Sequence, residues 1–201
     1  EGSYNIAIGS DALGGLKDST ADSSQFNIFM GVNSGNGGWV TTVSQYNIGI
    51  GHYTMDAAMN GATNNVAVGH LALSAITTGD ANVSLGSEAG ESIDTGLYNV
   101  SVGYQSNEAI TSGQYNITIG AFALETATTA LKNIMIGGGA GQNITAGVAV
   151  NGAIGIGYGA FGGAGTQTTD INHTIAIGTS ALAALTSGGK NLAIGYEAGK
   201  E

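Results

Sequence analysis

The side chains of this sequence that could carry chemistry are few, and three carboxylates stand close together. Glu88, Glu91 and Asp94 lie in one short segment. Glycoside hydrolysis needs two carboxyl groups that face each other across a cleft. This segment has no aromatic residues placed as sugar subsites, so we interpret the three carboxylates as a solvated acidic face.

Two of the three histidines raise the question of a metal site. His52 and His70 each follow a glycine directly, and imidazole pairs are common metal ligands. No carboxylate recurs beside them at the same spacing, so neither a metal nor any other cofactor is predicted. No Ser–His–acid set can be placed by a geometric argument, and the G-x-G-x-x-G match at Gly157–Gly162 precedes no amphipathic helix. We therefore do not predict an enzyme.

Charge and composition exclude several classes of partner and fold. The 201 residues carry a net charge of −10, with four lysines and no arginine. Such a chain cannot neutralise a phosphate backbone, so nucleic-acid binding is excluded. Attraction to an anionic membrane fails for the same reason, and no apolar run is long enough for membrane insertion. The hydrophobic content of 42% argues against disorder.

A repeat that covers the whole chain must position all of these residues. Each copy reads asparagine, apolar, small, apolar, glycine, and a small residue follows the glycine three positions later. Copies are 17 residues apart in the middle of the chain and up to 22 apart near its ends. The motif glycines are Gly9, Gly31, Gly51, Gly69, Gly86, Gly103, Gly120, Gly137, Gly157, Gly178 and Gly195.

This repeat predicts a parallel β-solenoid. Alternating apolar residues indicate short strands, with Ile6 and Ile8 facing inward and Ala7 facing outward. A unit of 17 residues with two or three short strands suits one solenoid coil. We predict one all-β domain over 1–201, built of about eleven 17-residue coils stacked about 4.8 Å apart. One coil buries little apolar surface, so we expect a homo-oligomer.

The recurrent residues have structural interpretations. The motif glycine is expected at a corner with positive φ, and the absence of proline fits a backbone ladder that crosses every coil. The aromatic residue before several asparagines is interpreted as a packing ladder. The asparagines themselves are expected to form a ladder of side-chain amides. They are Asn5, Asn27, Asn47, Asn65, Asn82, Asn99, Asn116, Asn133 and Asn191.

Insertions into the 17-residue unit supply candidate binding residues. They lie at 17–25, 39–45, 145–151 and 165–172, and their common place in the unit predicts loops along one edge of the rod. Trp39 could stack on a sugar ring, although packing across its own loop is the favoured alternative. The candidate contacts to a host-surface glycan or protein are Trp39, Asn36, Thr41, Asp18, Asp22 and Thr168.

The best copies of the repeat, Asn5–Leu13 and Asn116–Leu124, resemble repeats of two related groups. These are the head domains of YadA-like trimeric autotransporter adhesins and the repeat arrays of bacteriophage tail fibres. The resemblance implies a homotrimer of left-handed parallel β-rolls that acts in attachment at a virion surface or another extracellular site. Handedness and the number three rest on the resemblance alone.

The longer, uneven spacing and the lack of a coiled-coil stalk or membrane anchor in the sequence favour the phage fibre over the bacterial adhesin head. We expect a segment of a longer fibre that joins other virion or fibre proteins end to end and mediates or supports attachment to the host cell. A fibre-borne polysaccharide depolymerase is a further alternative. An ice-binding solenoid would need regular Thr-x-Thr ranks, and those at Thr126–Thr128 and Thr166–Thr168 are isolated.

Overall fold

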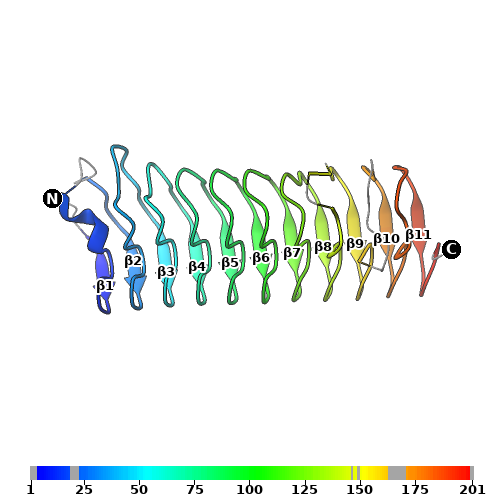
Figure 1. Cartoon of the computed structure of the whole chain (residues 1–201), viewed down its shortest axis with the longest axis horizontal. Coiled ribbons are helices and arrows are strands. Elements are labelled where there is room, and N and C mark those ends of the chain that lie inside the picture. The colour runs from blue at the N-terminus through cyan, green and yellow to red at the C-terminus, as the bar shows by residue number, and fades with distance from the viewer. Residues whose placement is uncertain (1–3, 19–22, 146, 149, 163–170, 200–201) are drawn as a thin grey trace.

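The fold is an all-β parallel solenoid, seen in a computed structural model that describes residues 4–18, 23–145, 147, 148, 150–162 and 171–199. Eleven strands form one parallel sheet in chain order, and each pairs only with its neighbours in sequence (Figure 1). The strands are β1 (Ile6–Ile8), β2 (Ile28–Met30), β3 (Ile48–Ile50), β4 (Val66–Val68), β5 (Val83–Leu85), β6 (Val100–Val102), β7 (Ile117–Ile119), β8 (Ile134–Ile136), β9 (Ile154–Ile156), β10 (Ile175–Ile177) and β11 (Leu192–Ile194).

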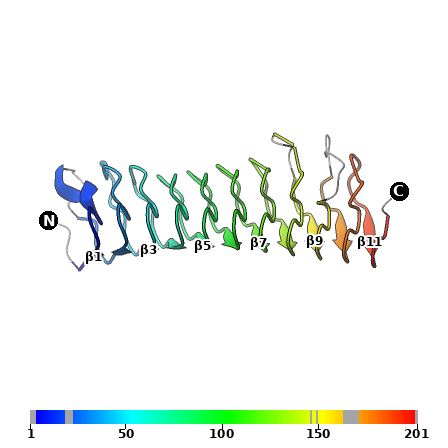
Figure 2. The same ribbon diagram turned by 60° about the horizontal axis from the view of Figure 1, so that its bottom comes forward.

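The coils stack in register along a rod. Each strand residue pairs with its equivalent in the next repeat, as Val83 pairs with Val100 and Ser84 with Ser101. The sheet lies along one side of the rod and the connecting loops lie on the other (Figure 2). The register is the same at both ends, so the extra residues of the longer repeats are taken up outside the strands. The predicted parallel solenoid is confirmed, with one strand for each of the eleven repeats.

The coils contain less regular strand than expected. Each coil has a single strand of three residues, whereas two or three strands per coil were expected. Isolated β-bridges also join Leu97, Gln114, Leu131 and Asn151 in successive coils. The second and fourth residues after every motif glycine have positive φ, for example Leu71 and Leu73 at 57° and 50°. Left-handed residues cannot continue an extended strand, so the backbone turns there. A short 3-10 helix, η1 (Gly14–Asp18), was also not predicted.

The prediction that Ile6 and Ile8 face inward is wrong. From β2 to β11 the middle residue of each strand is buried, whereas its two neighbours are half-buried or exposed. In β1 all three residues are exposed. The motif asparagines from Asn27 to Asn133 have buried side chains inside the coil, and residues two apart in a strand share a face. The small middle residue therefore faces inward with the asparagine.

The interior of the coil is narrow, and large side chains need glycines beside them. Phe29 is the middle residue of β2, and a Cβ placed on Gly49 in β3 would lie 2.5 Å from its Cδ1 atom. Met135 and Phe161 leave as little room at Gly155, where a Cβ would lie 2.7 Å from Sδ and 3.0 Å from Cδ2. Bulky and empty positions are thus matched between neighbouring coils, as close packing requires.

Part of the interior is polar. The middle residues of β5 and β6 are Ser84 and Ser101, and Asn107 lies inside the same coil as Ser101. The two serine hydroxyls and both amide atoms of Asn107 are buried and make no hydrogen bond within the protein. Buried polar groups without partners reduce the stability of the folded state.

Replacement of Ser101 by alanine is expected to raise the free energy of unfolding by about 1 kcal/mol, because alanine removes a hydroxyl without a partner. Alanine already occupies the equivalent place in β4 as Ala67. Ser106→Ala is the matched control and should lower stability, because the Ser106 hydroxyl donates to the Thr118 carbonyl at 3.2 Å. Chemical denaturation followed by circular dichroism measures both. A loss of stability in Ser101→Ala would contradict the assignment.

Two features of the structure require glycine at the motif position, its backbone conformation and the closeness of the next coil. Its φ lies between 128° and 141° in all eleven repeats, which confirms the expected positive φ. Backbone in this region is accessible almost only to glycine. A Cβ at Gly86 would in addition lie 2.6 Å from the carbonyl oxygen of Gly103, its equivalent in the next coil.

Gly86→Ala is expected to lower the free energy of unfolding by about 3 kcal/mol, from backbone strain together with the clash against the next coil. Gly38→Ala is the control, since a Cβ there meets no atom within 4 Å and no positive φ is required. Chemical denaturation should show a large shift for the first variant and almost none for the second. Similar midpoints for the two would refute the requirement for glycine.

Candidate functional site

The asparagine ladder holds the sheet in place. In each step the backbone N–H and the Nδ2 group of one asparagine donate to the Oδ1 atom of the asparagine in the preceding coil. Asn116 does so to Asn99 at 3.1 and 2.9 Å. The Nδ2 group of Asn99 donates in turn to the carbonyl oxygen of Gly113, at 2.8 Å. Each amide therefore binds its coil to both neighbours.

Eight asparagines form this unbroken ladder, and it ends where the motif degenerates. They are Asn5, Asn27, Asn47, Asn65, Asn82, Asn99, Asn116 and Asn133. In the next coil Ala153 keeps only the backbone bond to the Asn133 side chain. Asn191, expected in the ladder, instead donates its backbone N–H to Thr174 Oγ1 and its amide to the Gly188 carbonyl.

The aromatic residues before the asparagines stack on one another. The rings of Tyr4, Phe26 and Tyr46 follow each other with centroids 5.2 Å apart, and Tyr98 stacks on Tyr115 at 5.0 Å. The planes of the first three rings are within 4° of parallel. Both faces of the Phe26 ring are covered by Tyr4 and Tyr46, so this ring is not a platform for a sugar. The interpretation as a packing ladder is confirmed.

The outer face of the sheet is apolar along its whole length. The first and third residues of every strand point outward and form two ladders, which we call the apolar strip. Ile117 and Ile119 in its middle are both 39% exposed. The strip consists of Ile6, Ile8, Ile28, Met30, Ile48, Ile50, Val66, Val68, Val83, Leu85, Val100, Val102, Ile117, Ile119, Ile134, Ile136, Ile154, Ile156, Ile175, Ile177, Leu192 and Ile194.

The apolar strip is comparable in size to the largest apolar patch of a typical monomer. Eleven strands at about 4.8 Å spacing make it about 50 Å long. Its two ladders are about 7 Å apart, so the strip covers about 350 Å² in projection. The largest apolar patch on a typical monomer is about 300–600 Å² and is often functional. No residue of the strip is charged or polar.

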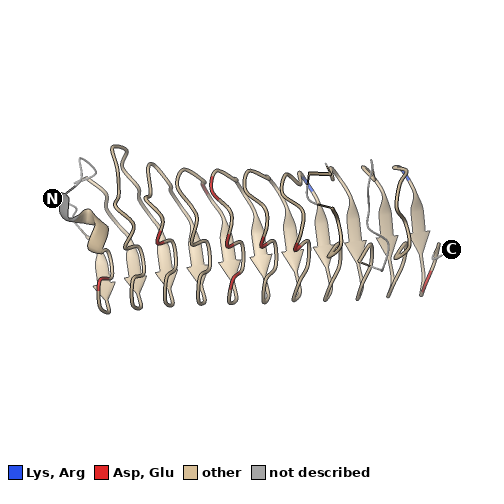
Figure 3. Ribbon diagram, viewed as in Figure 1, with Lys and Arg blue, Asp and Glu red and all other residues tan. Residues whose placement is uncertain are grey.

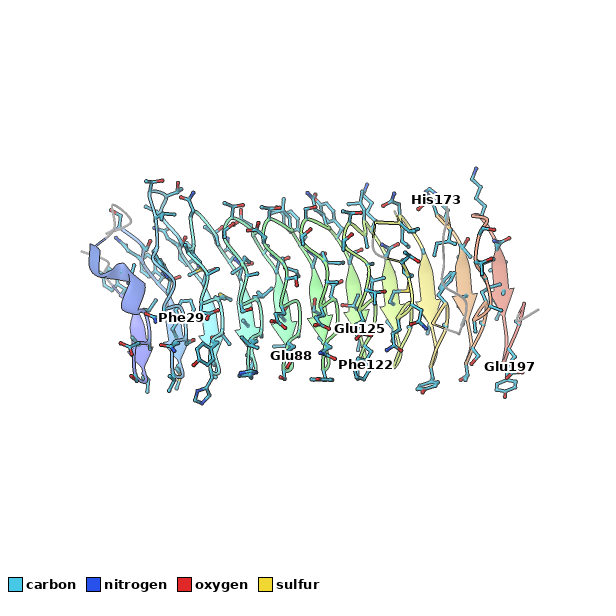
Figure 4. All side chains as sticks on the ribbon, viewed as in Figure 1. Phe29, Glu88, Phe122, Glu125, His173 and Glu197 are labelled. Atoms are coloured by element: carbon cyan, nitrogen blue, oxygen red, sulfur yellow. The ribbon has the colours of Figure 1, made fainter. Side chains whose placement is uncertain are left out.

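Acidic side chains form another ladder on the surface. The fifth residue after the motif glycine is Asp56, Glu91, Glu108 or Glu125 in four coils. Red segments follow this line along the middle of the rod in Figure 3, and Figure 4 labels Glu125 together with Glu88. Carboxylate oxygens of Glu88, Glu91 and Glu108 lie within 4.8 Å of one another. Asp94, which the sequence analysis grouped with Glu88 and Glu91, instead accepts a hydrogen bond from the Thr77 hydroxyl.

Stacking of like charges shifts the acidity of these groups. Partial burial raises the pKa of Glu108, and the neighbouring Glu125, Glu91 and Glu88 raise it further. The pKa of Glu91 is raised by partial burial and by Glu88 and Asp56, against an opposing effect of His70. Burial also raises the pKa of Asp56. The acidic ladder therefore favours protonated carboxyls in the folded state.

The structure describes part of the set of candidate receptor contacts. Trp39 is buried, donates from Nε1 to the Gly35 carbonyl at 2.9 Å, and meets Phe29 edge to face at 5.9 Å. Its proposed stacking on a sugar is thus wrong, because the ring packs inside its own coil, where it is buried. Asn36 is half-buried and its amide donates to Asn33, at 3.1 Å.

Two of the remaining candidates lie outside the described residues. Thr41 is exposed and its hydroxyl donates to Asn60 Oδ1 at 3.4 Å. Asp18 ends η1. Asp22 and Thr168 lie outside the described residues. His52 and His70 are exposed in adjacent coils, and His70 meets Tyr53 edge to face at 6.1 Å.

Two surface features were not predicted from the sequence. The apolar strip was not predicted because hydrophobicity alone indicated Ile6 and Ile8 as the inward residues. The asparagine is two positions before the middle residue of the strand, so an inward asparagine places that middle residue inside instead. The acidic ladder has a simple signal, a carboxylate at one fixed distance from the motif glycine in several repeats.

No protein-family model, curated protein or solved structure matches the chain. Within the part of the chain that the structure describes, no helix is long and apolar enough to cross a membrane.

The acidic ladder predicts a pH-dependent stability. Because the folded-state pKa of Glu108 is raised, the folded state binds more protons than the unfolded chain between the ordinary carboxyl pKa and the raised one. Its contribution to stability is therefore lost as pH rises through that window. Glu108→Gln should raise the free energy of unfolding at pH 7 by about 0.5 kcal/mol after solvent screening, and the gain should vanish below the ordinary carboxyl pKa.

Thermal unfolding of both proteins at pH 7 and pH 3.5 measures this difference. Asp11→Asn is the control, because Asp11 is an exposed carboxylate outside the acidic ladder, and it should give no comparable pH-dependent gain. A Glu108→Gln gain of equal size at the two pH values would show that charge repulsion is not its cause.

Proposed function

We propose that the protein is a non-enzymatic fibre module, a homotrimer of left-handed β-rolls that mediates or supports attachment of a virion to the host cell surface. The apolar strip is the observation that carries this proposal. Three parallel copies that turn their strips toward a common axis would remove the strips from water along the whole rod. The repeat resemblance supplies the number three and the handedness.

The energetics favour such an assembly. Apolar area removed from water contributes about 25 cal/mol per Å², and stable interfaces bury about 800 Å² per partner. A strip of about 350 Å² in projection, together with the exposed aromatic ladder beside it, supplies a substantial part of that area. The absence of charge in the strip means that no ion must be desolvated when copies associate.

The shape of the chain supports a structural role. A single sheet with ten equal parallel pairings makes a straight, extended module, as seen in Figure 1. Such a module can hold a binding surface away from a particle, as one segment among other virion or fibre proteins. The head of a bacterial trimeric adhesin would use the same physics and remains the alternative. Electron cryomicroscopy of the source particle would locate the protein on a fibre or on a cell.

A fibre-borne polysaccharide depolymerase is the other alternative. The carboxylates of Glu88, Glu91 and Glu108 are half-buried and lie within 4.8 Å of one another, closer than the roughly 5–9.5 Å that separates the two carboxyl groups of glycosidases. Incubation of the purified protein with host capsule or surface polysaccharide should release no reducing ends. Their release would replace the fibre proposal with an enzymatic one.

The double variant Ile117→Lys/Ile119→Lys tests the role of the apolar strip. The wild-type chain is expected to sediment at three times its mass of 19.8 kDa, and the variant as a monomer, because two ammonium groups would be buried in the trimer. Both side chains point away from the coil interior, so circular dichroism should show an unchanged fold. Analytical ultracentrifugation at micromolar concentration measures the mass.

Val40→Lys is the matched control, since Val40 is an exposed apolar residue outside the strip. It should leave the trimer intact. A stable wild-type monomer, or a double variant that still forms trimers, would contradict the proposed interface.

A further inference from the structure

The column of motif asparagines is interrupted near the C-terminal end of the rod. Its place is held by Ala153 in the coil of β9 and by Thr174 in the coil of β10. Asparagine returns as Asn191 in the coil of β11, but its amide donates to the carbonyl of Gly188, three residues before it, at 2.7 Å. We call the coils of β10 and β11 the C-terminal segment, which lies at the orange to red end of the rod in Figure 1.

Side-chain hydrogen bonds of the ladder are missing where this segment begins. In a regular step Asn99 donates its backbone N–H and its Nδ2 group to Asn82 Oδ1, both at 3.0 Å, and Asn82 Nδ2 donates to a carbonyl of the next coil at 2.8 Å. Ala153 has no side-chain donor or acceptor, so all three bonds are missing between β9 and β10. Between β10 and β11 one bond remains, from the Asn191 N–H to Thr174 Oγ1 at 3.2 Å.

The backbone pairing of the strands continues into the segment. The Ile154 N–H donates to the Thr174 carbonyl at 2.9 Å, and the Gly178 N–H donates to the Ile156 carbonyl at 2.7 Å. Strands β9 and β10 also keep the parallel register of the other pairs. The segment therefore has the same fold as the rest of the rod, and the difference lies in the strength of the contact between its coils and those before them.

The strength of each contact decides where a solenoid opens. Its stability is approximately a sum of terms for single coils and for the contacts between neighbouring coils, so opening is easiest at a weak contact. One hydrogen bond within a protein changes such an equilibrium by about fivefold. The loss of three bonds favours opening between β9 and β10 by on the order of 100-fold.

We propose that the C-terminal segment is a separately opening unit, whose coils open and reclose while the coils before it stay closed. Ala153 sets the boundary, because it is the residue that interrupts the asparagine ladder. The unit is a conformational device that makes one end of a stiff module compliant. The inference goes beyond the proposed function, since it concerns contacts between the coils of one chain and applies to a monomer as well as to a trimer.

Hydrogen exchange of the 201-residue chain, followed by NMR, tests the proposal at two matched amides. The Ile28 N–H donates from the second coil to the third, at 2.9 Å to the Asn47 carbonyl. The Gly178 N–H joins the second coil from the other end to the third, at 2.7 Å to the Ile156 carbonyl. The two amides are equally far from an end of the rod. After correction for intrinsic exchange rates, Gly178 should exchange about 10- to 100-fold faster than Ile28.

Ala153→Asn restores two of the three missing bonds, because Thr174 at the next position still lacks an amide. Ala153 is buried in the column where other coils hold a buried asparagine, so an amide suits this place. Exchange at Gly178 should slow by about tenfold, and exchange at Ile28 should not change. Asn27→Ala is the converse variant, because it removes the same three bonds between the second and third coils. It should speed exchange at Ile28 by about 10- to 100-fold and leave Gly178 unchanged.

Equal exchange rates at Ile28 and Gly178 in the wild type would overturn the proposal. An unchanged rate at Gly178 in folded Ala153→Asn would also overturn it, because the missing amide would then not be the cause of the opening. If Ala153→Asn does not fold, Asn27→Ala decides the question. Faster exchange at Ile28 in that variant supports the proposal, and an unchanged rate there refutes it.

Discussion

The hydrogen bonds of the asparagine ladder set the register of the first eight coils. Two N–H groups of one asparagine converge on the side-chain oxygen of the asparagine in the coil before, so the two residues must lie directly above one another. One such step fixes the register of the strand that follows. Repeated through eight coils, it allows repeats of 17 to 22 residues to share one sheet, because added residues cannot shift the strands. Since the amides must be inside, the middle residue of each strand is inside too.

The alternation of inward and outward residues along each strand gives the apolar residues two different roles. Within the strands, small side chains such as Ala67 and Thr118 face the narrow interior, and the larger Ile and Val residues face outward. The loops supply most of the large core side chains, among them Leu73, Ile93 and Ile110. The core and the apolar strip therefore consist of different residues, so the stability of the coil and the formation of an assembly depend on different positions. Substitutions on the two faces should have separable effects.

Much of the fold could be predicted from the sequence, because in-register stacking imposes the same structural requirement at the same position of every repeat. The period, the parallel solenoid, the positive φ of Gly86 and its equivalents, and the stacking of Tyr98 on Tyr115 all follow from aligned columns. The inward face was mistaken because Ile and Ala alternate with the same period whichever side is inside. Trp39 could not be placed, since its burial depends on an edge-to-face contact with Phe29 and a hydrogen bond to the Gly35 carbonyl, and neither recurs from repeat to repeat. The candidate receptor contacts were chosen from the insertion loops. The sequences of these loops do not recur from repeat to repeat, so the repeat does not indicate how their side chains are placed.

The orientation of the hydrogen bonds has a mechanical consequence. Those between coils run along the long axis of the rod, so tension along that axis pulls on them directly, while the covalent chain crosses from coil to coil only once. A coil of 17 residues occupies about 4.8 Å of the rod and extends to roughly 60 Å when it is pulled out. Under load the chain would lengthen by releasing single coils from an end, each step dissipating work while the remaining coils keep their register. A tether built this way yields gradually and does not break at one point.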